Sequence, residues 1–346
     1  GGGSIAWVDN GTLRVGPQSA GAAPGPACYG LGGVEPTVTD ANLVLGYLSA
    51  AEFAFPLSVE LAEQALARVA EPLGVDAVTA AAAIHEIANA QMGAAIHVVT
   101  VRRGIDPRGY TLVALGGAAP THVAGLAALF GITRVLMPPN CGVGSAAGLL
   151  YASLAVERAR TFLSPVGTLT SCSAGGDALS ELSDLLAELE ENARADLSHP
   201  EGTEVVRSVG VRFLGQAHAF TIELASGPVT PALIGQVVEE FYQRYHESYG
   251  IALRDPAELT TARVRVVLPA STPRMVPDQV RQADQVRTRR VWVDGGFADI
   301  PVVTRVPGRE LQGPGILTEP QCSLLVPPGW QATVDADGAV VLEVSA

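Results

Sequence analysis

Two glycine-rich stretches carry the residue types and spacing that suit phosphate chemistry. The chain opens with GGGS (Gly1, Gly2, Gly3 and Ser4), and GGAAPTH occupies residues 116–122. Consecutive glycines leave backbone N–H donors uncovered by side chains, and a helix that follows directs its positive end to the same place. Each stretch also has an ordinary interpretation. GGGS is equally typical of an expression tag or a flexible terminus, and a lone Gly-Gly pair is typical of a tight turn without a ligand.

Two titratable side chains near these stretches are candidates for acid–base work. Asp40 follows two threonines in TVTDAN, and His122 ends the GGAAPTH stretch. Asp40 is suited to face a metal-bound phosphate or to transfer a proton. The alternative for Asp40 is a helix N-cap, and the alternatives for His122 are capping and packing.

Arginines supply all the positive side-chain charge. The 22 basic residues include no lysine, which excludes a P-loop lysine, a lysine Schiff base and a lysine general base. Arg102, Arg103 and Arg108 surround Asp106, and this cluster either clamps an anion or forms a self-paired turn.

Cysteine and histidine spacing predicts no metal site. The four cysteines form no CxxC pair, and the histidines show no pair at metal-ligand spacing. We therefore expect free thiols and no metal held by the protein. The four cysteines are Cys28, Cys141, Cys172 and Cys322.

Strands and helices that would position the glycine stretches are recognisable from periodicity. A strand at 110–115, a glycine turn at 116–120 and a helix at 121–130 are followed by a second unit of the same kind, RVLMPP and NCGVGSAAGLLYASL. Two strand–turn–helix units in succession predict α/β architecture. Upstream, the pattern predicts a hairpin around Asn10 and Gly11, a helix that begins at Thr39 or Asp40 and ends at Leu48, and helices at 58–73 and 76–99.

The character of the chain changes after residue 165. An acidic amphipathic helix at 177–197, strands at 204–213, 218–225 and 259–268, and a helix at 231–248 indicate an α+β region. Short apolar runs between Gly and Pro turns follow. We expect three domains: residues 1–165, an α+β region at 166–275, and a small all-β domain at 276–346.

Composition restricts the class of protein. With 48% apolar and 16% charged residues among 346, the chain is typical of a globular protein. It has no recognisable signal peptide and no apolar run of membrane-spanning length, so we expect a cytoplasmic protein that does not bind membranes. A net charge of −13 argues against nucleic acid as a partner.

Several long motifs together resemble the hydantoinase A/5-oxoprolinase/acetone carboxylase family. They are the first 48 residues, GIDPRGYTLVALGGAAPTHVAGLA, VLMPPNCGVGSAAGLLYA, VRFLGQAHAFTIEL, FYQRYHESYG and GPGILTEPQCSLLVPPGW. They occur in the family's order and extend from residue 1 to near the end of the chain. Ala119 and Thr121 stand where the family commonly has Gly and Leu.

The resemblance implies a fold and a nucleotide site. The family is similar to the actin, sugar-kinase and heat-shock-chaperone superfamily, in which two ribonuclease-H-like lobes close on ATP. By this analogy residues 1–165 are the second lobe, and Gly1, Gly2, Gly3 and Ser4 form its phosphate loop. Gly116, Gly117, Ala118 and Pro120 would hold adenosine. The first lobe, with its own phosphate motif, is not in this sequence, so we expect it on a longer polypeptide or a separate chain.

The resemblance also implies an activity. Family members use ATP to phosphorylate a carbonyl or amide oxygen, which gives an unreactive amide a leaving group. We expect part of an A-type subunit of an ATP-dependent cyclic-amide hydrolase that uses ATP and Mg²⁺. Its expected partners are the missing lobe and a B-type subunit, which itself holds a further metal in some members, in a hetero-oligomer. The alternatives are a ketone carboxylase subunit and a non-catalytic scaffold half.

Overall fold

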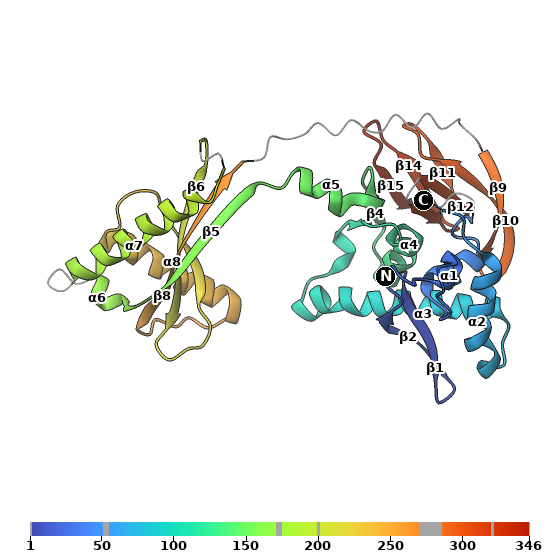
Figure 1. The fold of residues 1–346 in the computed structure, drawn as a ribbon, viewed down its shortest axis with the longest axis horizontal. Helices are drawn as coiled ribbons and strands as arrows, with labels where there is room; N and C mark the ends of the chain where they lie inside the picture. Colours follow the sequence, from blue (N-terminus) through green and yellow to red (C-terminus); the bar gives the residue numbers. More distant parts are fainter. Residues whose placement is uncertain are drawn as a thin grey trace. The chain divides into compact units, whose positions relative to one another are not determined.

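The computed structural model describes residues 2–50, 55–170, 175–198, 201–269, 286–319 and 322–345. These residues form two compact units (Figure 1). Unit 1 combines the chain up to residue 149 with residues 286–345, and unit 2 contains the described residues from 150 to 269. This division differs from the three domains predicted from the sequence, because the C-terminal strands pack into the same unit as the N-terminal segment.

The N-terminal part of unit 1 is a hairpin followed by three helices. The hairpin turns at Asn10 and Gly11, both with positive φ (48° and 75°), as such a two-residue turn requires. Ser58 and Asp76 cap the two longer helices through their side chains. No described helix is both long and apolar enough to cross a membrane. The elements are β1 (Ser4–Asp9), β2 (Thr12–Ser19), α1 (Val38–Val44), α2 (Val59–Leu73) and α3 (Ala77–Val99).

The predicted strand–glycine turn–helix unit is present. Strand β3 (Leu112–Val113) leads through the turn into α4 (Ala119–Leu129), and β4 (Arg134–Met137) returns parallel to β3. The second unit continues from β4 into α5 (Gly144–Leu150). Strand β3 is shorter than the predicted 110–115 and lies at the edge of its sheet.

Seven C-terminal strands complete unit 1, and each belongs to one of two sheets. The five-stranded sheet has the order β11-β14-β15-β4-β3, and the four-stranded sheet has the order β13-β12-β10-β9. In the first of these, β15 pairs antiparallel with β4, so the end of the chain is hydrogen-bonded to its first half. The strands are β9 (Val286–Val293), β10 (Gly296–Thr304), β11 (Glu310–Gln312), β12 (Gly315–Glu319), β13 (Cys322–Val326), β14 (Trp330–Val334) and β15 (Val340–Val344).

Buried apolar side chains explain why these strands belong to unit 1. Ile316 of β12 and Val291 of β9 are fully buried in one cluster with Leu66 of α2 and Ile84 of α3. A second cluster joins the β13–β15 strands to α4 and β4. Neither the helices nor the strands could bury their apolar faces alone.

Unit 2 is an antiparallel sheet covered by helices. Its strand order is β5-β8-β6-β7, and one cluster of buried side chains joins the sheet to α7 and α8. Strand β5 was not predicted, because its sequence LAVERARTFLSP is mostly exposed and lacks a period-two apolar pattern. The elements are β5 (Leu154–Pro165), α6 (Val166–Thr170), α7 (Gly175–Ala195), β6 (Glu204–Phe213), β7 (Phe220–Leu224), α8 (Pro231–Tyr249) and β8 (Ala257–Leu268).

We expect Ile316→Ala to destabilise the protein by about 2–5 kcal/mol, since it leaves a cavity between the C-terminal strands and the helices. The free energy of urea-induced unfolding measures this. Val286→Ala is the control, because Val286 is 65% exposed and its truncation should change the free energy by less than about 0.5 kcal/mol. Equal effects of the two substitutions would contradict this account of the core.

Candidate functional site

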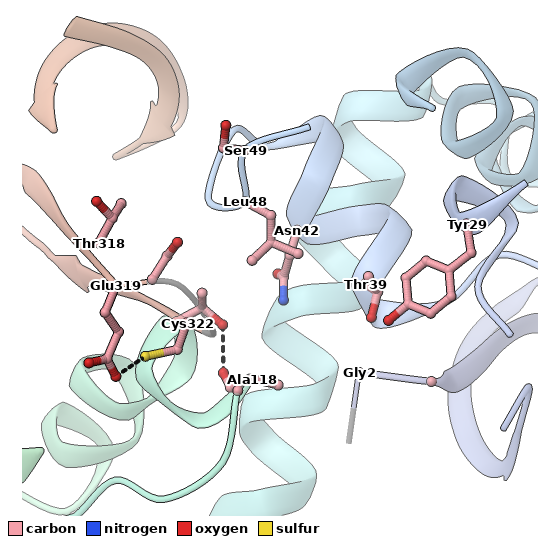
Figure 2. Close-up of a pocket in the computed structure, with 14 residues that line it drawn as sticks. Gly2, Tyr29, Thr39, Asn42, Leu48, Ser49, Ala118, Thr318, Glu319 and Cys322 are labelled. Atoms are coloured by element: carbon pink, nitrogen blue, oxygen red, sulfur yellow. Dashed lines mark hydrogen bonds between the residues drawn. The ribbon is translucent and has the colours of Figure 1, made fainter. Parts of the chain in front are cut away.

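One pocket in unit 1 brings the two glycine stretches together. It is a cavity of about 250 Å³, and its walls come from four separate parts of the chain (Figure 2). Of the predicted cofactor residues, Gly2, Gly3, Gly117 and Ala118 line it, whereas Ser4, Gly116 and Pro120 do not. Gly1 lies outside the described residues. The full lining is Gly2, Gly3, Tyr29, Thr39, Asn42, Leu48, Ser49, Gly117, Ala118, Thr121, Thr318, Glu319, Cys322 and Ser323.

The first glycine stretch is held tightly against its neighbours. The Gly2 carbonyl accepts a hydrogen bond from Thr39 N–H at 2.8 Å, and the Gly3 carbonyl accepts one from Ala20 N–H at 2.8 Å. A Cβ atom added to Gly2 would lie 2.5 Å from Thr39 Oγ1. Glycine is therefore required by space at this position, and its backbone forms the pocket wall.

The second glycine stretch leads into the start of α4. Gly116 has a φ of +95°, and its N–H donates to the Cys141 carbonyl at 2.7 Å. No side chain caps α4, which begins at Ala119, two residues earlier than predicted. The wall at Gly117 and Ala118 thus consists of backbone and a methyl group beside a helix N-terminus, an arrangement that favours negative charge.

Asp40 lies behind the pocket wall and has a structural role. Thr37, not Thr39 or Asp40, is the N-cap of α1, and Asp40 is the third residue of a capping box. Asp40 is fully buried. Its Oδ2 accepts from the N–H and hydroxyl of Thr37 and from Ala27 N–H, and its Oδ1 accepts from Cys28 N–H at 2.8 Å. This carboxylate does not line the pocket, and both of its oxygens accept hydrogen bonds from the protein; its expected catalytic role stays a prediction.

His122 is also buried rather than exposed in the pocket. It stacks on His85 with ring centroids 4.3 Å apart. Nδ1 of His85 lies 2.8 Å from Oδ1 of Asn42, whose amide nitrogen lies 3.1 Å from Nε2 of His122. Nδ1 of His122 lies 2.8 Å from Oδ1 of Asn89. Each contact is satisfied when both imidazoles are neutral and carry their hydrogen on Nδ1. The network therefore holds Asn42 in the pocket wall, whereas His122 does not line the pocket.

Burial keeps both imidazoles neutral. It lowers the pKa of His85 to about 4. Burial, followed by the neighbouring His85, lowers the pKa of His122 to about 3. A general base that is to work near neutral pH needs a pKa close to that pH, so neither histidine is suited to that task.

The arginine cluster forms a self-paired turn. Arg108 Nη2 lies 2.7 Å from Asp106 Oδ2, and both side chains are exposed. Hydrogen bonds from Arg108 lower the pKa of Asp106 to about 2. Of the two alternatives for this cluster, the structure supports the turn.

Two family profiles match this chain. Residues 1–158 match the sequence profile of Hydantoinase/oxoprolinase, and residues 171–343 match that of the Hydantoinase/oxoprolinase C-terminal domain. The chain belongs to the hydantoinase/oxoprolinase family.

Individual relatives show how much of a family member this chain spans. It is 33% identical to caprolactamase subunit alpha of Pseudomonas jessenii, over 97% of this chain and 50% of the relative. It is 31% identical to acetophenone carboxylase gamma subunit of Aromatoleum aromaticum, over 99% of this chain and 50% of the relative. The chain thus spans about half the length of the curated relatives that it matches.

Solved structures share the mixed α/β fold of this family member. The crystal structure of ATP-dependent caprolactamase from Pseudomonas jessenii matches all of this chain and 52% of its own, with a TM-score of 0.73 and 32% identity. A nucleotide-free acetone carboxylase structure matches 99% of this chain and 52% of its own, with a TM-score of 0.81 and 22% identity. At that identity the second likeness concerns the fold alone.

One wall of the pocket, formed by β12 and β13, was not predicted from the sequence. Across the pocket, the glycine stretches are faced by residues that lie about 200 positions or more away in sequence: Thr318, Glu319, Cys322 and Ser323. The Glu319 side chain is 5% exposed and pairs with Arg305 at 2.8 Å. A hydrogen bond with Cys141, burial and the nearby Glu319 carboxylate raise the pKa of the Cys322 thiol far above its ordinary value. All four lie in the family-like motif GPGILTEPQCSLLVPPGW, but their place in the pocket depends on β-strand pairing, which no local pattern records.

We expect Asp40→Asn to lower the free energy of unfolding by about 1–3 kcal/mol, because both carboxylate oxygens accept buried hydrogen bonds and an amide has only one oxygen. Asp76→Asn is the matched control: Asp76 is an exposed N-cap that accepts from Thr79 N–H through Oδ1, which Asn reproduces. Urea-induced unfolding of the two variants measures the difference. Equal stabilities would show that Asp40 is an ordinary cap.

We also expect stability to fall with acidification between about pH 6.5 and 5. The unfolded state binds protons at the ordinary histidine pKa of 6.5, whereas folded His85 and His122 stay neutral. The unfolded state therefore binds more protons than the folded state in this window. As the pH falls, each histidine lowers the free energy of unfolding by up to about 1.4 kcal/mol per pH unit. Unfolding free energies across this range should show a smaller slope for His85→Gln than for wild type. His97→Gln, on the exposed face of α3, should keep the wild-type slope, and identical slopes for all three proteins would refute this assignment.

Proposed function

We propose that this chain is part of the A-type subunit of an ATP-dependent cyclic-amide hydrolase, and that its pocket binds the nucleotide. The observation that carries the proposal is the meeting of Gly2 and Gly3 with Gly117 and Ala118 in one pocket wall. These segments offer backbone, a helix N-terminus and almost no side chain, which suits a polyanion in a chain without lysine. Membership of the hydantoinase/oxoprolinase family and the 33% identity to a caprolactamase subunit support the reaction type.

The pocket is suited to part of the nucleotide. At about 250 Å³ it is smaller than the roughly 300–1,000 Å³ typical of sites that enclose a whole drug-sized ligand. We propose that unit 1 is the second lobe of an actin-like ATPase fold and that the facing lobe completes the site. The lengths of the matched relatives, about twice the span of this chain, support that arrangement.

Within the described pocket lining, the residues fit a polyphosphate better than a free Mg²⁺ ion. Gly2 and Gly3 line the pocket with backbone and no side chain. The described lining holds one carboxylate, that of Glu319, whereas a Mg²⁺ ion held by protein alone needs several oxygen ligands. We therefore propose that Mg²⁺ enters with the nucleotide and is held by phosphate oxygens and water, as is common for this ion.

ATP would supply the phosphoryl group that turns an amide oxygen into a leaving group. This chain's residues would orient it: Gly2 and Gly3 around the phosphates, and Gly117 and Ala118 beside the base. Asn42, held by His85 and His122, would present an amide of fixed orientation to the pocket. A B-type partner subunit would complete the hydrolysis.

A ketone carboxylase subunit is the second candidate. The 31% identity to acetophenone carboxylase gamma subunit over 99% of this chain supports it. The two activities share ATP-driven activation of a carbonyl oxygen and differ in the nucleophile that follows. The pocket described here is compatible with both.

Reconstitution with polypeptides that supply the other lobe and a B-type subunit tests the proposal. We expect ADP release coupled to opening of caprolactam, 5-oxoproline or hydantoin, and no turnover by this chain alone. Coupling to acetone or acetophenone with bicarbonate would favour the carboxylase. A complex that assembles without nucleotide turnover on any of these substrates would indicate a scaffold half, and robust turnover by the chain alone would contradict the two-lobe proposal.

Within the same complex, Gly117→Val should weaken ATP binding at least about tenfold, the equivalent of 1.4 kcal/mol, because a branched side chain would stand where the nucleotide contacts backbone. Gly148→Val is the control, since Gly148 of α5 is outside the pocket and has open space at its Cβ position. Calorimetric titration with ATP and Mg²⁺ measures both affinities. An unchanged affinity for Gly117→Val would show that this stretch is only a turn.

A further inference from the structure

Two cysteines that are 181 residues apart meet beside the pocket. Cys141 begins the short 3₁₀ turn after β4, and Cys322 is the first residue of β13. Their Sγ atoms are 3.3 Å apart. Both thiols donate to the same oxygen of Glu319, at 3.2 Å from Cys141 and 2.7 Å from Cys322. Figure 2 shows the contact between Cys322 and Glu319. The three potential ligand atoms all lie within 4.8 Å of one another.

We propose that Cys141, Glu319 and Cys322 form a binding site for one zinc ion. This site goes beyond the proposed nucleotide function and does not depend on it. The strands that carry it are already in place, since Glu319 of β12 pairs directly with Cys322 of β13.

The observed spacing needs little change to hold the ion. With Zn–S near 2.3 Å and Zn–O near 2.1 Å, tetrahedral coordination separates two sulfurs by about 3.8 Å and a sulfur from an oxygen by about 3.6 Å. The three atoms are now closer than this because they share thiol hydrogens. When a central ion replaces those hydrogens, each pair of ligand atoms must separate by about 0.5–1 Å more.

The chemistry of the donors selects a thiophilic ion. Two sulfurs and one carboxylate favour Zn²⁺ over Mg²⁺ or Ca²⁺, which prefer all-oxygen sites. The charges also balance: two thiolates and one carboxylate carry −3, and Zn²⁺ with the guanidinium of Arg305 carries +3. This balance matters because Cys141 is fully buried and Cys322 is 6% exposed, and uncompensated charge there would be costly.

Arg305 has the contacts of a residue that orients a ligand. Its Nη1 pairs with Glu319 Oε2, whereas the thiols contact Oε1. One carboxylate oxygen thus faces the cysteines while the other is held by the arginine, the usual arrangement behind a metal-ligating carboxylate.

Three protein ligands leave a fourth position for a small molecule. Glu319 and Cys322 also line the pocket, so water or a donor atom of the pocket's occupant can reach the ion from that side. Zinc sites with three protein ligands and one open position are typical of reactive rather than purely structural zinc.

Metal titration of the 346-residue chain tests the proposal. The reduced, metal-free chain is titrated with Zn²⁺ against a chromophoric chelator, and with Co²⁺ as a spectroscopic probe. We expect one ion per chain, a thiolate-to-cobalt charge-transfer band, and protection of two thiols from alkylation by Zn²⁺. The protection assay uses the wild-type chain, so it does not depend on the folding of a variant.

Substitutions assign the ligands. Cys141→Ser and Cys322→Ser should each weaken Zn²⁺ binding by about 100-fold or more, and Glu319→Gln by about 10- to 100-fold. Cys28→Ser is the control: Cys28 is a buried free thiol outside the cluster and should leave binding unchanged. Absence of stoichiometric binding would overturn the proposal, as would full binding by the double variant Cys141→Ser/Cys322→Ser. A Cys141–Cys322 disulfide that persists in mass analysis of the chain handled under air with Zn²⁺ would also overturn it.

Discussion

The pairing of β15 with β4 is the contact on which the rest of unit 1 depends. It attaches the last strands of the chain to the strand that follows the second glycine stretch, and the neighbouring β13–β15 side chains bury α4. The pocket has a glycine wall from the N-terminal half and a polar wall from β12 and β13. This pairing, together with the packing of β9 and β12 against α2 and α3, holds the two walls in one unit. A long-range contact of this kind costs chain entropy, and the apolar area buried by the two clusters offsets that cost.

A layer of buried polar groups supports the glycine wall from behind. Asp40 binds the loop at Ala27 and Cys28 to the start of α1, and Asn42 connects α1 to His85 of α3 and His122 of α4. Buried polar groups are costly unless all their hydrogen bonds are made. Here the described contacts satisfy them, since no described buried side-chain nitrogen or oxygen lacks a partner. The layer therefore specifies one arrangement of three helices rather than several similar ones.

The two walls differ in chemistry. The glycine wall offers backbone donors and a helix N-terminus, which attract anions without any cationic side chain. The opposite wall offers a carboxylate and a thiol, of which the carboxylate is balanced by Arg305. A ligand with a polyanionic end and a second, softer or metal-binding end would find complementary partners on both sides. This asymmetry suits a ligand whose two ends differ in charge and in metal-binding character.

The amino-acid sequence by itself determined the local elements and the family. Ser58 and Asp76 start helices α2 and α3 as their capping side chains require, the glycine turn at 116–118 leads into a helix, and the ordered motifs identify a hydantoinase/oxoprolinase chain. These features depend on contacts between near neighbours, which sequence patterns record. Tertiary structure alone decided that β15 joins β4 and that Cys141 meets Cys322. Those outcomes depend on which apolar faces pack together across 100 residues or more, and no spacing along the chain encodes that choice.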